Sequence, residues 1–228
     1  MKGGVRAVPL AFLVLACSAC SDQNAPVTGH AQVRMLALGD SYTIGESVPV
    51  DDRWPVQLAV LLEEGDAPPV RVEIVARTGW TTAELDAAVD DAALRGTFDL
   101  VTLLAGVNDQ YRGLAVEGYR ERFAALVQRA IGFACGDPSR VIVVSIPDWG
   151  VTPFGGGNPV VSAEIDAFNA VNRDEAAAAG VAWVDVTGIS RSGDPGLVAG
   201  DGLHPSGAQY ARWAETLLPA ALAALGRG

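Results

Sequence analysis

Residues 33–46 read VRMLALGDSYTIGE, an apolar run that passes directly into a polar turn. A short continuous apolar run bounded by turn residues is typical of a strand that is buried on both faces of a parallel sheet. Ser41 follows this run and has two possible roles, as a turn serine that caps the next helix or as a nucleophile. The remainder of the chain has to distinguish them.

Four further apolar runs resemble the first one and are separated by helical patterns. We therefore predict five strands, at residues 33–38, 70–76, 100–105, 141–146 and 181–186. One helix begins with a capping box formed by Thr81 and Glu84. The other helices are expected at residues 54–63, 119–134, 163–179 and 207–225. This alternation predicts an α/β fold, a three-layer α/β/α sandwich around a mainly parallel five-stranded sheet.

The amino terminus has a different character. Lys2 and Arg6 precede a short apolar run that ends in small residues and cysteines, which is the pattern of a signal peptide. We predict a lipoprotein-type signal peptide over residues 1–19, with cleavage before Cys17 or Cys20, a polar tether over residues 20–32, and one folded domain over residues 33–228. The protein is then exported from a bacterial cell and held at the membrane by a lipid, with simple secretion as the alternative.

The charge and histidine content restrict the chemistry. The formal net charge of −11 argues against a nucleic-acid partner, and contact with a membrane is expected only through the lipid anchor. The chain has two histidines, His30 in the tether and His204 in the domain. One histidine and one thiol cannot complete a histidine-rich zinc site. A site made of carboxylates alone is left open but has no signature in the sequence, and we expect neither a metal nor another cofactor. A histidine base in the domain has to be His204.

Polar or glycine-containing motifs follow every predicted strand. Because parallel strands end at one edge of a sheet, and ligands bind at that edge, the motifs are expected to lie together. They occupy residues 39–41, 77–80, 106–109, 147–150 and, after a loop, 201–205.

Asp201 precedes His204 by three residues on one loop. That spacing allows the carboxylate to bind the imidazole Nδ1–H and to orient the ring as a base. We expect Pro205 to open the last helix. Taken alone, the same residues could equally form a polar turn that caps a helix.

A serine nucleophile also needs hydrogen-bond donors for the oxyanion that develops during attack. Three groups at neighbouring strand ends could supply them: the Ser41 N–H, the Gly79 N–H and the Asn108 side-chain amide. Each is an ordinary turn residue when considered singly. Their joint placement at one edge of the sheet favours an active site.

These motifs together resemble the SGNH/GDSL hydrolase superfamily, which includes bacterial thioesterase/lysophospholipase-like esterases. The resemblance covers residues 33–228 and implies a flavodoxin-like sandwich. It also implies Ser41 as the nucleophile, Asp201 and His204 as the rest of the triad, and an oxyanion hole made by Ser41, Gly79 and Asn108. The family usually has leucine where this chain has Tyr42. The G-x-S-x-G motif of ordinary α/β-hydrolases is absent from the sequence.

The resemblance implies a serine ester hydrolase that acts through an acyl-enzyme on carboxylic esters, either acyl or lysophospholipid-like esters or small aryl and alkyl esters. A polysaccharide O-acetyl esterase is the alternative, and an acyl-transfer or non-catalytic α/β module is a further one. The substrate would be a small-molecule, glycan or lipid ester. The long loop at residues 147–161 is expected to overhang the site. Trp149 and Phe154 are candidate pocket residues that line an acyl or sugar pocket; the alternative is that they only pack the loop against the domain.

Overall fold

The computed structural model describes residues 32–65 and 67–227. The predicted signal peptide, both candidate lipidation cysteines and all but the last residue of the predicted tether lie outside this part of the chain. Within the described residues, none of the helices combines the length and the apolar character that crossing a membrane requires.

The centre of the fold is a five-stranded sheet in the order β2-β1-β3-β4-β5, and every neighbouring pair is parallel. This confirms the predicted fold class. The strands are β1 (Val33–Gly39), β2 (Val70–Ala76), β3 (Leu100–Leu104), β4 (Val141–Val144) and β5 (Ala182–Val184). The last strand is shorter than predicted, because beyond Val184 the backbone N–H of Val186 donates to the Ser145 side chain instead of continuing the ladder.

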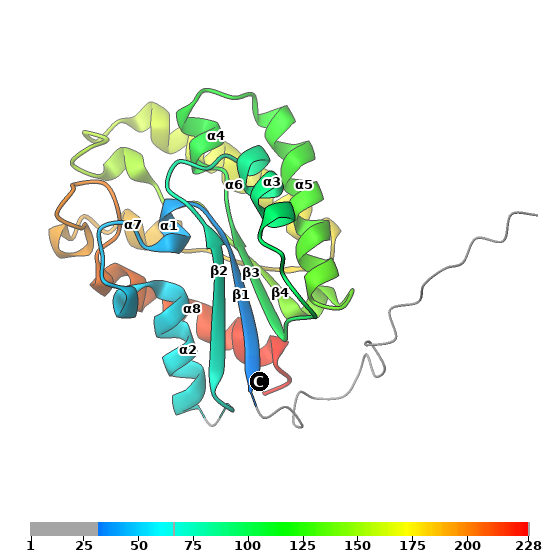
Figure 1. Ribbon diagram of the computed structural model, residues 1–228. Helices are drawn as coiled ribbons and strands as arrows, with labels where there is room; N and C mark the ends of the chain where they lie inside the picture. The colour runs from blue at the N-terminus through cyan, green and yellow to red at the C-terminus, as the bar shows by residue number, and fades with distance from the viewer. Residues whose placement is uncertain (1–31, 66, 228) are drawn as a thin grey trace, which may run out of the picture.

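Helices cover both faces of the sheet (Figure 1). On one face lie α2 (Trp54–Glu64) and α8 (Gly207–Ala224), which pack against each other; on the other lie α3 (Thr82–Asp91), α5 (Val116–Phe133) and α6 (Pro159–Ala178). The chain moves outward from β1 to β2 and then back past β1 to β3. Because crossover connections are right-handed, this reversal places α2 on one face and α3, α5 and α6 on the other.

The short helices lie at the carboxyl edge of the sheet, and they were not predicted. They are α1 (Ser41–Ile44), α4 (Val107–Tyr111) and α7 (Thr187–Ser190). Four 3₁₀ turns complete the described structure, at Val50–Asp52, Pro138–Arg140, Trp149–Val151 and Pro195–Leu197.

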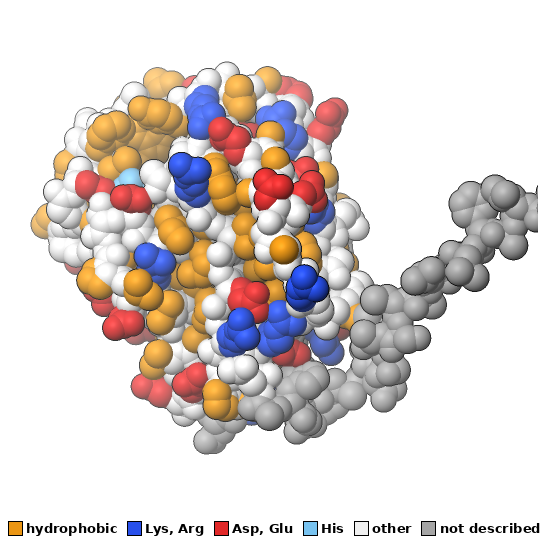
Figure 2. All heavy atoms as spheres, viewed as in Figure 1, with side chains coloured by type: hydrophobic (Ala, Val, Ile, Leu, Met, Phe, Trp, Pro, Cys, Tyr) orange, Lys and Arg blue, Asp and Glu red, His pale blue; other side chains and the backbone are white. Residues whose placement is uncertain are grey.

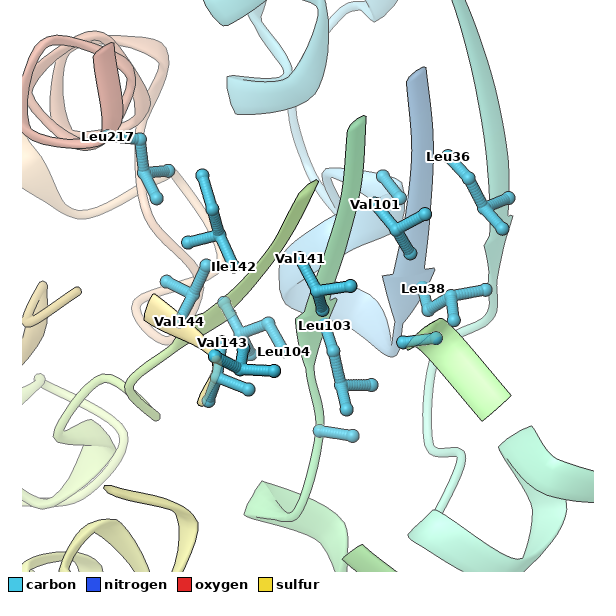
Figure 3. Packing of buried hydrophobic residues seen from close by; sticks show 14 of the residues in the cluster. Leu36, Leu38, Val101, Leu103, Leu104, Val141, Ile142, Val143, Val144 and Leu217 are labelled. Carbon is cyan, nitrogen blue, oxygen red and sulfur yellow. The ribbon is translucent and has the colours of Figure 1, made fainter. Parts of the chain in front are cut away.

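The hydrophobic core has its centre on β1, β3 and β4. All residues of β3 and β4, and all of β1 except Arg34, are buried. Figure 3 shows these strands contributing leucine, valine and isoleucine side chains to a continuous apolar layer, with Leu217 of α8 packed against it. The central strands therefore form a rigid support, and their carboxyl ends position the turns that follow them.

The capping signals decide where the helices begin. The predicted capping box is confirmed: the Thr81 hydroxyl accepts from the Glu84 N–H, and the Glu84 carboxylate accepts from the Thr81 N–H. The last helix begins at Gly207 with Ser206 as its N-cap. The prediction that Pro205 opens this helix is wrong, because Pro205 is instead held in an isolated bridge to Val198 and the Ser206 hydroxyl caps the helix.

Candidate active site

Ser41 is the first residue of α1 and is separated from the end of β1 by Asp40 alone. Only 5% of Ser41 is exposed. The turn that presents it is tight. A Cβ atom on Gly39 would lie 2.2 Å from Thr43 Oγ1 and 2.6 Å from the Leu104 carbonyl oxygen, so only glycine fits at the end of the strand. The Asp40 carboxylate caps the short helix by accepting from the Tyr42 N–H at 3.0 Å.

Asp40 is fully buried, and its second oxygen, Oδ2, makes no hydrogen bond within the described residues. Burial raises the pKa of Asp40 to about 7; the Tyr42 N–H opposes this rise and the charge of Asp109 adds to it. A carboxyl group directly before the candidate nucleophile is therefore partly protonated near neutral pH.

Asp201 and His204 are joined as the sequence spacing predicted. Asp201 Oδ2 lies 2.7 Å from His204 Nδ1, and Asp201 Oδ1 accepts from the backbone N–H groups of Leu203 and His204 at 2.9 and 3.0 Å. Burial alone would raise the pKa of Asp201, but hydrogen bonds from Ser47, from His204 and from the two backbone N–H groups hold it well below its usual range. The imidazole of His204 is buried and lies beside the Tyr42 ring, with 5.5 Å between ring centres.

Ser47 is a site residue that the sequence reasoning missed. Its hydroxyl donates to Asp201 Oδ2 at 2.6 Å across 154 positions of the chain. A serine in an exposed turn carries no motif, and nothing in the spacing between the two residues indicates the contact.

The two predicted oxyanion donors beyond Ser41 are held by hydrogen bonds to neighbouring residues. Asn108 Nδ2 donates to the Trp80 carbonyl at 2.9 Å, which fixes the amide plane. Gly79 has a φ of +86°, a conformation that favours glycine. The Arg112 guanidinium donates to the Gly79 carbonyl and pairs with Glu84 at 3.2 Å. Arg112 thus supports the glycine turn.

Asp109 joins the segments that carry Asn108 and Gly79. Its buried carboxylate accepts from the N–H of Thr82 at 2.8 Å and from the Thr82 hydroxyl at 2.7 Å. The Arg122 guanidinium lies 3.2 Å from Asp109 Oδ1 and compensates the negative charge of this carboxylate. These bonds tie α4 to the beginning of α3.

One cavity of about 190 Å³ brings the predicted site residues together. Ser41, Gly79, Asn108 and His204 all line it, and so do both predicted pocket residues, Trp149 and Phe154, together with Tyr42, Thr78, Val107, Tyr111 and Leu203. Asp201 does not line the cavity; it contacts His204, which does.

An aromatic rim borders this cavity, made by Tyr111, Trp149 and Phe154. The Trp149 ring centre lies 5.4 Å from that of Tyr111 and 5.9 Å from that of Phe154. Trp149 Nε1 donates to Gln110 at 2.8 Å, and the Phe154 N–H donates to the Gly202 carbonyl at 2.9 Å. Tyr111 and Phe154 are each more than half exposed. Figure 2 shows hydrophobic side chains gathered on the surface beside a histidine.

This fold and this arrangement of residues define an ester hydrolase of the three-layer α/β/α type. The chain belongs to the GDSL-like lipase/acylhydrolase family, whose model matches residues 37–212. The family resemblance predicted from the sequence is therefore confirmed.

Several solved structures are similar to this chain. TesA is 23% identical, with a TM-score of 0.65 over 84% of this chain and 99% of that chain. A lipase/acylhydrolase from Enterococcus faecalis is 20% identical, with a TM-score of 0.67 over 82% and 94% of the two chains. Axe2, an acetylxylan esterase from Geobacillus stearothermophilus, is 20% identical, with a TM-score of 0.64 over 85% and 94%. No curated protein matches this chain. At these identities the likenesses support the fold, and the family match supports the activity class.

Proposed function

We propose that the protein hydrolyses carboxylic esters through an acyl-enzyme formed on Ser41. The observation that carries this proposal is the convergence of Ser41, His204, Gly79 and Asn108 on one cavity at the carboxyl edge of the sheet. An ester carbonyl placed there would meet a nucleophile, a base and hydrogen-bond donors together.

The reaction follows from the contacts of His204. Asp201 holds Nδ1 as the protonated nitrogen, so that Nε2 can accept the Ser41 proton. Ser41 Oγ attacks the ester carbon, and the resulting oxyanion accepts hydrogen bonds from the Ser41 and Gly79 N–H groups and from the Asn108 amide. Collapse of this intermediate breaks the ester C–O bond, and the alcohol leaves with the proton from His204. A water then gives a proton to His204 as its oxygen attacks the acyl carbon. The bond between Ser41 Oγ and the acyl carbon breaks, the acid leaves, and His204 returns the proton to Ser41.

The volume of the cavity and the aromatic residues of its rim indicate which esters could fit as substrates. At about 190 Å³, the cavity is smaller than the roughly 300–1,000 Å³ that is usual for pockets of drug-sized ligands. It therefore suits a short acyl group, while a longer chain would extend onto the rim of Tyr111, Trp149 and Phe154. We propose acyl esters, including lysophospholipid-like and small aryl or alkyl esters, as substrates.

Removal of O-acetyl groups from a polysaccharide is the second candidate. The small cavity would hold an acetyl group, and the exposed aromatic rim offers faces on which a sugar ring can stack. The similarity in fold to an acetylxylan esterase supports this alternative.

A panel of p-nitrophenyl esters from acetyl to long acyl chains, assayed beside acetylated xylan, separates the candidates. Activity that persists as the acyl chain lengthens favours the acyl-ester proposal, and activity confined to acetyl groups favours deacetylation. Ser41→Ala is expected to abolish both activities in a folded protein. Unchanged hydrolysis by Ser41→Ala would disprove the nucleophile, and an inactive native protein would favour a transferase or a non-catalytic module.

We also propose that the protein is exported and held at a bacterial membrane by a lipid on Cys17 or Cys20. The charged start, the short apolar run and the small residues before these cysteines support this proposal. Partition of the full chain into a detergent phase, with mass spectrometry of its amino terminus, tests it. Replacing the lipidated cysteine with serine should move the protein into the aqueous phase, and a native protein that stays aqueous would contradict the anchor.

A further inference from the structure

The turn that follows α1 contacts two different loops of the site through adjacent side chains. The Ser47 hydroxyl donates to Asp201 Oδ2 at 2.6 Å, and Glu46 accepts a hydrogen bond from the hydroxyl of Thr78, the neighbour of Gly79. The turn is itself bound to the candidate nucleophile, because the N–H groups of Gly45 and Glu46 both donate to the Ser41 carbonyl at 3.0 Å. Ser47 therefore lies on a segment whose position depends on Ser41.

The backbone of Ser47 adopts an unusual conformation. Its φ is +66°, and it is one of three non-glycine residues with a positive φ in the described part of the chain. Glycine adopts this left-handed conformation without steric cost, whereas a residue with a Cβ atom does not. Serine at this position is sterically less favourable than glycine, but its hydroxyl forms the hydrogen bond to Asp201.

The Ser47 bond completes the coordination of the Asp201 carboxylate. Oδ1 accepts from two backbone N–H groups, and Oδ2 accepts from His204 Nδ1 and from Ser47. A carboxylate has about four acceptor positions, so every one is occupied and the group cannot rotate without breaking a bond. The Asp201 side chain is 31% exposed, and loss of the serine would open one position on Oδ2 to water.

We propose that Ser47 is a positioning residue that fixes the Asp201 carboxylate relative to Ser41, so that His204 is oriented toward the nucleophile. This inference rests on the proposed function, since it assigns Ser47 a part in the same reaction. Ser47 acts through Asp201 and does not line the cavity. Its removal should therefore lower kcat and leave the binding of substrate largely unchanged.

Two substitutions separate the hydroxyl from the backbone. Ser47→Gly removes the hydroxyl and suits the positive φ, whereas Ser47→Ala removes the hydroxyl and keeps a Cβ atom in the strained conformation. We expect kcat for p-nitrophenyl acetate to fall by about tenfold in both variants, with KM within about twofold of the native value, because a hydrogen bond to a charged group is lost. Ser47→Asn, which tolerates a positive φ and keeps an N–H donor, should recover part of the loss.

Ser139→Ala is the matched control. The Ser139 hydroxyl donates to Asp137 Oδ1, also at 2.6 Å and at an exposed position, but neither residue lines the cavity. It should retain native kcat. If Ser47→Gly kept native kcat, the hydroxyl would have no positioning role and the proposal would be overturned. Ser47→Gly decides the question even if Ser47→Ala fails to fold.

Ser41→Ala, measured in the same series, keeps the two proposals apart. An inactive Ser41→Ala beside a fully active Ser47→Gly would overturn the role of Ser47 alone. An active Ser41→Ala would instead overturn the proposed function, and the role of Ser47 with it.

Discussion

Replacing Asp40 with asparagine should change how the stability of the protein depends on pH. Burial raises the pKa of Asp40 to about 7 from an ordinary value of 3.8. Between these two values the folded protein holds a proton that the unfolded chain has released. The unfolded state is therefore favoured progressively as the pH rises, and the contribution of Asp40 to stability falls from about pH 4 to about pH 7 and then levels off.

The magnitude follows from the size of this pKa difference. A difference of about three units, at about 1.4 kcal/mol per unit, amounts to about 4 kcal/mol. Asparagine has nearly the same shape, retains an oxygen that can accept from the Tyr42 N–H, and does not titrate. The stability of Asp40→Asn relative to the native protein should therefore improve by up to about 4 kcal/mol between pH 4 and pH 8.

Urea unfolding of both proteins at half-unit intervals from pH 4 to pH 8 measures this difference. Other titrating groups, including Asp201, are common to the two proteins and largely cancel in the comparison. Asp51→Asn, which removes an exposed carboxylate, corrects for the change in net charge. A stability difference between Asp40→Asn and the native protein that stays constant over this range would contradict the raised pKa of Asp40.

Three further outcomes are expected. Asn108→Ala should lower kcat for p-nitrophenyl acetate by about 100-fold or more with little change in KM, because an oxyanion donor acts mainly in the transition state; an effect on KM alone would contradict that role. Asp201→Asn should lower kcat by about 10³- to 10⁴-fold, because the imidazole loses the partner that selects its tautomer, and near-native turnover would count against the triad. Gly106→Ala should reduce the free energy of unfolding in urea by about 3 kcal/mol, since its φ is +124° and the new Cβ would lie 2.5 Å from the buried Tyr119 ring. Gly132→Ala in α5, where a Cβ meets no atom within 4 Å, should instead be neutral or stabilising by about 0.5–1 kcal/mol, and an equal loss in both variants would argue against the steric explanation.

The layers of the fold and the edge of the sheet that carries the site follow from the pattern of residues along the chain. Continuous apolar runs between helical patterns require strands that are covered on both faces, and parallel strands end at a common edge. The positions of Ser41, Gly79, Asn108 and His204 follow from these two rules together with the family pattern. The contact of Asp201 with His204 was predictable as well, because a spacing of three residues on one loop allows the carboxylate to reach the imidazole.

The groups that support these residues could not be predicted from the sequence pattern. Three features depend on how distant segments pack. They are the contact of Ser47 with Asp201, the contact of Arg112 with the Gly79 carbonyl, and the raised pKa of Asp40. The start of α8 beyond Pro205 depends on the local bridge to Val198. Periodicity reports which face of an element is buried, but it carries no information on the path of a loop. Hydrogen bonds between loops and the desolvation of a single carboxyl group arise only once the whole chain has folded.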